Sequence, residues 1–139
     1  MPNRVESVEV PIAVAIGGAI GAVARWGLAS AMVSDLPLAT FITNLLGCFA
    51  LGVVLVAGEV VGHRQGHHHH RQKWWVRLWR PFLATGVLGG FTTFSTLVLE
   101  LNQLTALVAL AYLLGSVLLG LSAYTVGNNW ARSLWRVNA

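Results

Sequence analysis

The residues best suited to chemistry in this sequence lie in one short stretch, from Gly86 to Thr96. Two adjacent glycines, Gly89 and Gly90, are followed by four hydroxyl residues within five positions. Glycine is a poor helix former, and serine and threonine side chains compete for backbone hydrogen bonds, so this stretch predicts a broken helix. A break exposes amide N–H groups, which suit anions, and carbonyl groups, which suit cations. A kink packed by a neighbouring helix is the alternative interpretation.

Polar side chains at three further places interrupt apolar sequence. Arg25 either reaches the membrane interface or lines a cationic vestibule that attracts an anion. Thr40 and Asn44 are four residues apart and therefore share one helix face, where Asn44 bonds either a neighbouring helix or a substrate. Tyr112 and Ser116 have the same spacing. Their hydroxyl groups either line a path or bond back to their own helix.

All of these residues belong to apolar stretches of about 20 residues or more, the length that a helix needs to cross a bilayer. The chain has 139 residues, of which 55% are hydrophobic and 10% charged. A soluble domain carries about 25% charged residues. We therefore predict an all-α integral membrane protein: a single domain, 1–139, with four transmembrane helices, the third broken at its centre. The predicted spans are 8–33, 36–61, 82–101 and 104–126.

The distribution of basic residues predicts the orientation. Of the nine Lys and Arg residues, one lies within the first span, and the other eight lie in the termini and in the His-rich connection 62–81. The two remaining connections carry none. Because basic loops stay in the cytoplasm, we expect a multi-pass protein of the cell membrane with both termini cytoplasmic. The first stretch is long and is preceded by acidic residues, which favours a retained helix over a cleaved signal peptide.

Four consecutive histidines, His67 to His70, lie in the basic connection. Imidazole groups bind transition metals, so a metal site is one interpretation. No Cys or acidic residue nearby completes such a site, and we expect a solvated loop instead. An engineered tag is a third interpretation.

Three motifs together resemble the CrcB/Fluc family of fluoride channels. The sequence GGAIGAVARW at 17–26 is similar to the family's GGxxGAxxRY, and TFITNLLGCF at 40–49 is similar to GTLxxNxxGxF of its second helix. The sequence GVLGGFTTFSTL at 86–97, followed by Glu100, is similar to GxxGGFTTFSTFxxE. The order, the spacing and the four-span layout agree over nearly the full length.

The resemblance implies a subunit of a fluoride-selective ion channel that lowers cytoplasmic fluoride by passive efflux. It implies an antiparallel dimer with pores along the subunit interface. Asn44 would hydrogen-bond the fluoride, and Phe94 would offer its ring edge, which is electropositive. The implied fluoride pathway consists of Arg25, Thr40, Asn44, Thr93, Phe94, Ser95, Tyr112 and Ser116. The implied cofactor is a structural Na+ ion at the dimer centre, held by the backbone carbonyls of Gly89 and Thr92.

Two departures from the family pattern point to a particular partner. Leu97 stands where the family usually has a second pore phenylalanine. The charge bias predicts insertion in one orientation, whereas an antiparallel homodimer needs both. We therefore expect the chain to work beside an oppositely oriented, related subunit that supplies the missing phenylalanine.

Two other functions compete with the channel. A small proton-coupled multidrug or cation transporter needs a titratable carboxylate deep in the membrane. Glu59 and Glu100 lie towards span ends. The charged residue within the first span, Arg25, is a cation and cannot serve as that carboxylate. The other competitor is a non-conducting partner subunit of a heterodimeric channel.

No catalytic residue set is visible, so we expect no enzyme activity, and the composition does not imply nucleic acid as a partner.

Overall fold

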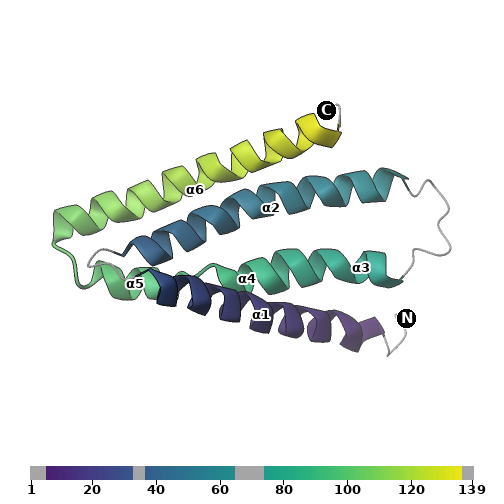
Figure 1. Cartoon of the computed structure of the whole chain (residues 1–139), viewed down its shortest axis with the longest axis horizontal. Coiled ribbons are helices and arrows are strands. Elements are labelled where there is room, and N and C mark those ends of the chain that lie inside the picture. The colour runs from purple at the N-terminus through teal and green to yellow at the C-terminus, as the bar shows by residue number, and fades with distance from the viewer. Residues whose placement is uncertain (1–5, 33–36, 65–73, 136–139) are drawn as a thin grey trace.

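A computed structural model of the chain describes residues 6–32, 37–64 and 74–135, and all regular elements within these ranges are helices (Figure 1). The predicted histidine loop at His67–His70 lies outside them. Two long helices come first, α1 (Glu6–Ala31) and α2 (Leu38–Arg64). The third span consists of α3 (Trp74–Arg80), the π-helix η1 (Pro81–Val87), α4 (Leu88–Phe91) and α5 (Ser95–Leu101). The last helix is α6 (Ala106–Trp135).

Four segments are long and apolar enough to cross a membrane: Val8–Ala31, Leu38–Val61, Arg77–Leu101 and Ala106–Trp135. The prediction of an all-α protein with four such helices is confirmed. α6 continues beyond the predicted end at 126. Its last turns mix polar and apolar residues, and there Arg132 bonds Asn128 and reaches Glu59 of α2.

The helices associate mainly in two pairs, α2 with α6 and α1 with η1 and α4 (Figure 1). The second pair depends on glycine. A Cβ atom at Gly21 of α1 would lie 2.7 Å from the amide nitrogen of Phe91 and clash with the carbonyl of Val87. In lipid, where burial from water does not drive helices together, such close backbone packing holds them.

The third span breaks where the sequence predicts a break, but after the glycines and not at them. Gly89 and Gly90 stay within α4. The chain becomes extended at Thr92 (φ −75°, ψ 156°), and helical geometry resumes with α5 at Ser95. Upstream, the π-helix begins at Pro81, whose ring would clash with the carbonyl of residue 77 in a regular α-helix; the wider π turn relieves this clash.

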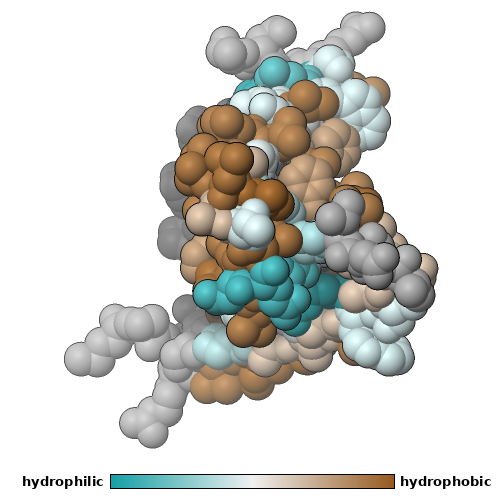
Figure 2. Space-filling view, turned by 90° about the vertical axis from the view of Figure 1, so that its left-hand side faces the viewer, coloured by the Kyte–Doolittle hydropathy of each residue, from teal (hydrophilic) through white to brown (hydrophobic). Residues whose placement is uncertain are grey.

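The bundle is thin, and most of its apolar side chains lie outside. Among the described residues, the only buried hydrophobic side chains are those of Val56, Leu97 and Ala131. Figure 2 shows the end of the bundle that carries the α5–α6 turn, where hydrophilic surface forms a small area among hydrophobic surface. Asn102, Gln103 and Thr105 are exposed polar residues of that turn. The large apolar exterior is suited to lipid or to another transmembrane chain.

Candidate functional site at the helix break

The side chain of Asn44 pairs with the backbone of Thr93 at the break. Its Nδ2 donates to the Thr93 carbonyl (3.0 Å), and its Oδ1 accepts the Thr93 N–H (2.8 Å). Unpaired backbone groups are costly at membrane depth, so this reciprocal pair explains how the break is tolerated. The amide group retains one N–H, which remains available to a ligand.

A second side chain replaces a helical hydrogen bond at the start of α5. The Thr93 hydroxyl accepts the N–H of Thr96 (3.2 Å) and lies 3.1 Å from the Thr96 hydroxyl. In a continuous helix, the N–H of Thr93 would bond the Gly89 carbonyl, and that of Thr96 would bond the Thr92 carbonyl. Both N–H groups donate elsewhere. The carbonyls of Gly89 and Thr92, the predicted cation ligands, have thereby lost their usual donors.

An open groove of about 450 Å³ runs along the break and is lined by α2, the third span and α6. Its polar or aromatic lining comes from Asn44, Thr92, Thr93, Phe94 and Ser116. None of the described residues that line it carries a charge. Phe94 is 73% exposed, so its ring is accessible beside the broken backbone. The groove therefore offers N–H and ring-edge hydrogens without a fixed cation, which suits a transient anion.

Two of the predicted pathway residues, Thr40 and Tyr112, meet around Glu100, three residues beyond the groove-lining Leu97. The Thr40 hydroxyl donates to Glu100 Oε1 (2.6 Å), and the Tyr112 hydroxyl lies 3.0 Å from both Glu100 Oε2 and the Pro37 carbonyl. Ser116 donates to the carbonyl of Tyr112 (2.7 Å). Ser116 thus both lines the groove and bonds back to its own helix.

The structure places the two remaining predicted residues outside the groove lining. Arg25 is half-buried on α1, and Ser95 is exposed at the first position of α5. In contrast, Glu100 has a central position that the residue-by-residue analysis missed. One available signal was its place in the third motif; another was its position as an acidic residue in an apolar span.

Comparison with known proteins identifies the chain's relatives. Residues 12–128 match the family described as CrcB-like protein, Camphor Resistance (CrcB). A protein of Paracoccus denitrificans named fluoride-specific ion channel FluC is 40% identical over 129 residues, covering 88% of this chain and 94% of the relative. A Nocardia farcinica protein named fluoride-specific ion channel FluC 2 is 38% identical, covering 99% and 96%. A FluC of Hyphomonas neptunium is 41% identical over 130 residues.

The family match extends from the first helix into the last, and therefore includes both sides of the break as well as the Glu100 cluster. The relatives align over nearly their whole lengths. These matches, with four membrane-spanning helices and the broken third span, establish that the chain belongs to the CrcB-like family.

Proposed function

We propose that this chain is a subunit of a fluoride-selective ion channel that lowers cytoplasmic fluoride by passive efflux. Curated relatives that match most of the chain are named fluoride-specific ion channels. The structural observation that carries the proposal is the uncharged groove at the break, where Asn44, Phe94 and Thr93 meet. An uncharged site of N–H and ring-edge hydrogens can hold an anion and still release it, as conduction requires.

Two groups in the groove are positioned to contact fluoride without rearrangement. The pairing with Thr93 fixes the amide of Asn44 and leaves one N–H free. The ring of Phe94 is largely exposed. The hydroxyls of Tyr112 and Ser116 already donate to other oxygens, so each has to leave its acceptor before it can donate to fluoride.

The backbone of the break also fits the predicted sodium ion. Hard cations bind carbonyl oxygen, and the carbonyls of Gly89 and Thr92 lack the helical donors that would compete for them. The residues present would hold Na+ as a structural ion shared with a second subunit. If so, replacing Na+ with N-methylglucamine in the buffer lowers the thermal stability of the assembled protein. Unchanged stability after complete exchange would contradict the sodium site.

The proposed assembly is an antiparallel pair of subunits. Both termini of this chain face the cytoplasm in it. The exposed apolar exterior and the open groove both leave room for a second transmembrane chain. Leu97 lines the groove and has no ring edge to offer. This supports an oppositely oriented paralogue as the partner, with a phenylalanine at the equivalent position.

Growth in fluoride tests the proposal in cells. The chain is expressed in a bacterial strain without its own fluoride exporter, alone and together with an oppositely oriented homologue. We expect growth at fluoride concentrations that arrest the parent strain. Protection should depend on the partner's presence if the heterodimer is correct. A membrane-inserted chain that gives no protection in either case would contradict the channel and favour a non-conducting subunit.

A further inference from the structure

Gly47 of α2 lies directly against the break in the third span. A Cβ atom at this position would clash with the Cγ2 methyl group of Thr92 and lie 3.6 Å from Cδ1 of the Phe91 ring. Gly47 follows Asn44 by three residues, so the two lie on one face of α2. Gly47 faces Thr92, and Asn44 pairs with Thr93. This face of α2 therefore contacts two consecutive residues of the break.

The side chain of Thr92 makes a contact through each of its two branches. Its hydroxyl donates to the carbonyl of Leu88 (2.9 Å), and its methyl group occupies the space that Gly47 leaves. A threonine side chain has three staggered rotamers, and rotation moves both branches together. A methyl group at residue 47 would therefore force Thr92 either to give up its hydrogen bond to Leu88 or to move its backbone.

The carbonyl of Thr92 belongs to the same peptide group as the N–H of Thr93. Asn44 Oδ1 accepts that N–H at 2.8 Å. In a trans peptide the C=O and N–H groups point in opposite directions, so this pairing directs the Thr92 carbonyl away from Asn44. Thr92 itself is extended (ψ 156°), whereas ψ is about −42° in an α-helix. The direction of the carbonyl thus depends on two contacts with α2, the hydrogen bond to Asn44 and the packing of Thr92 against Gly47.

We propose that Gly47 is a positioning residue for sodium. By leaving space for the methyl group of Thr92, it keeps the Thr92 carbonyl in the direction in which it can bind the ion. The inference rests on the proposed sodium site and names a residue that controls its affinity without touching the ion. Replacing a residue that orients a metal ligand typically lowers metal affinity about ten- to hundredfold.

The test is thermal denaturation of the purified full-length protein in detergent, with a partner subunit if the unmodified chain needs one. The Na+ concentration is varied, and N-methylglucamine keeps the ionic strength constant. An ion that binds only the folded state raises the midpoint temperature once its concentration exceeds the dissociation constant. Gly47→Ala should move the onset of this rise to Na+ concentrations about tenfold higher.

Thr92→Ser provides the compensating change, because serine keeps the hydroxyl that bonds Leu88 but lacks the methyl group that packs against Gly47. Adding Gly47→Ala to a chain that already carries Thr92→Ser should therefore change the onset little. This double-mutant comparison isolates the contact between the two residues. If Gly47→Ala alone does not assemble, adding Thr92→Ser should restore assembly for the same reason.

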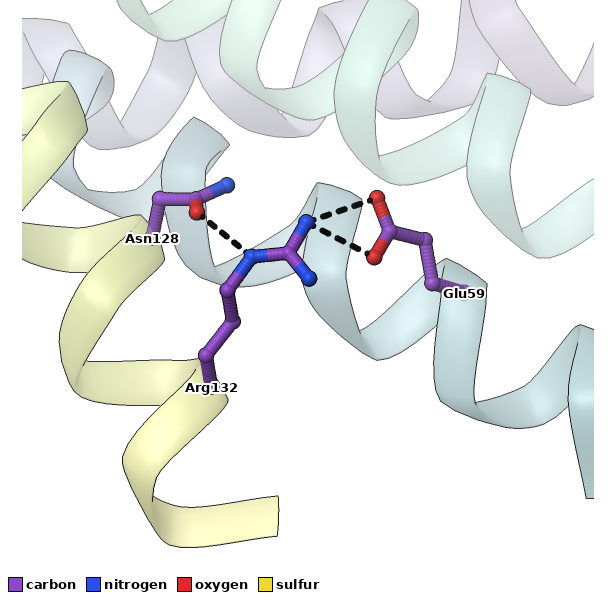
Figure 3. A network of polar contacts seen from close by, with 3 residues as sticks. All are labelled: Glu59, Asn128 and Arg132. Carbon is purple, nitrogen blue, oxygen red and sulfur yellow. Dashed lines mark hydrogen bonds and ion pairs between the residues drawn. The ribbon is translucent and has the colours of Figure 1, made fainter. Parts of the chain in front are cut away.

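Gly52→Ala is the control for a loss of packing away from the break. A Cβ atom there would clash with the carbonyl of Tyr124 and lie 2.8 Å from the amide nitrogen of Asn128, both on α6. Figure 3 shows Arg132 between Asn128 and Glu59, further along the same two helices. Because this contact is separate from the break, Gly52→Ala should lower the midpoint temperature at every Na+ concentration and leave the onset of the rise unchanged.

Three outcomes would overturn this inference alone: the same onset in Gly47→Ala and the unmodified protein, an equal shift in Gly52→Ala, or a defect of Gly47→Ala that Thr92→Ser does not reduce. No rise with Na+ in the unmodified protein would overturn the sodium site and this inference with it. Fluoride efflux from liposomes, measured on the same preparation, tests the channel function separately.

Discussion

At the scale of single residues, the side chain of Asn44 replaces hydrogen bonds that a continuous helix would make. It supplies both an acceptor and a donor to Thr93, so one residue satisfies two backbone groups at the break. The remaining N–H points to a second role in ligand binding. Structural support and binding are therefore combined in one amide group, so a substitution of Asn44 affects both the stability of the protein and its binding of a ligand.

Replacing Asn44 with alanine should destabilise the protein and abolish fluoride efflux. Leaving a buried donor or acceptor without its partner costs about 1–3 kcal/mol. The measurement is thermal denaturation in detergent, followed by efflux from liposomes. The matched control is Asn102→Ala, since Asn102 is exposed and only bonds the Val98 carbonyl at the end of its helix. An Asn44→Ala protein with unchanged stability would show that the pairing with Thr93 is not needed for the break.

The sequence predicted these residues better than it predicted their partners. It left open whether Asn44 bonds a neighbouring helix or a substrate, and the structure gives the neighbouring helix. The partner, Thr93, is 49 residues away in the chain, so no local pattern could identify it. For the same reason the contacts of Glu100 with Thr40 and Tyr112 were not foreseen, because they depend on how three helices pack.

At the scale of elements, the third span passes through four successive conformations. Pro81 starts a π-helix, the two glycines remain helical, Thr92 becomes extended, and α5 follows. The sequence predicted a break in this stretch but not its place. Glycine only permits a departure from helical geometry. The side chains of Asn44 and Thr93, which bond the backbone around Thr93, determine where the departure occurs.

The contact between α1 and the third span gives a prediction about helix packing. Gly21→Ala places a methyl group against the backbone of Val87 and Phe91, and backbone cannot move aside as a flexible side chain can. We expect a loss of about 1–3 kcal/mol, the usual cost of overpacking. Thermal denaturation in detergent measures it. Gly27→Ala is the matched control on the same helix, because a Cβ atom there meets no atom within 4 Å. Equal stability of the two variants would contradict the described packing.

At the scale of the whole molecule, the described residues form no substantial interior of their own. Few of their side chains are buried, and the groove is open along one side. We therefore propose that a second chain closes the fluoride pathway. The number of spans was predictable from hydrophobic length, since it depends only on composition along the chain. The identity of the second chain was not, since it depends on surfaces of another molecule.

The charge distribution predicts how the chain enters the membrane. All basic residues outside the first span lie in segments expected on one side, so we expect insertion in a single orientation. A reporter that is active only in the cytosol, fused to the C-terminus, should be active in essentially every inserted chain. A reporter that is active only outside the cytosol should be silent at the same position. Substantial signal from both fusions would remove the argument for an oppositely oriented partner.

The central claim, that this chain forms part of a fluoride-selective path, is tested most directly by efflux from liposomes that contain the purified protein. Fluoride and chloride release are measured with a neutral ionophore carrying the counter-ion. The account predicts rapid fluoride release without chloride release, from the chain together with an oppositely oriented homologue. Fluoride release from this chain alone would support the proposed channel function, but it would show that no different partner subunit is needed. No selective fluoride release in either preparation would contradict the account.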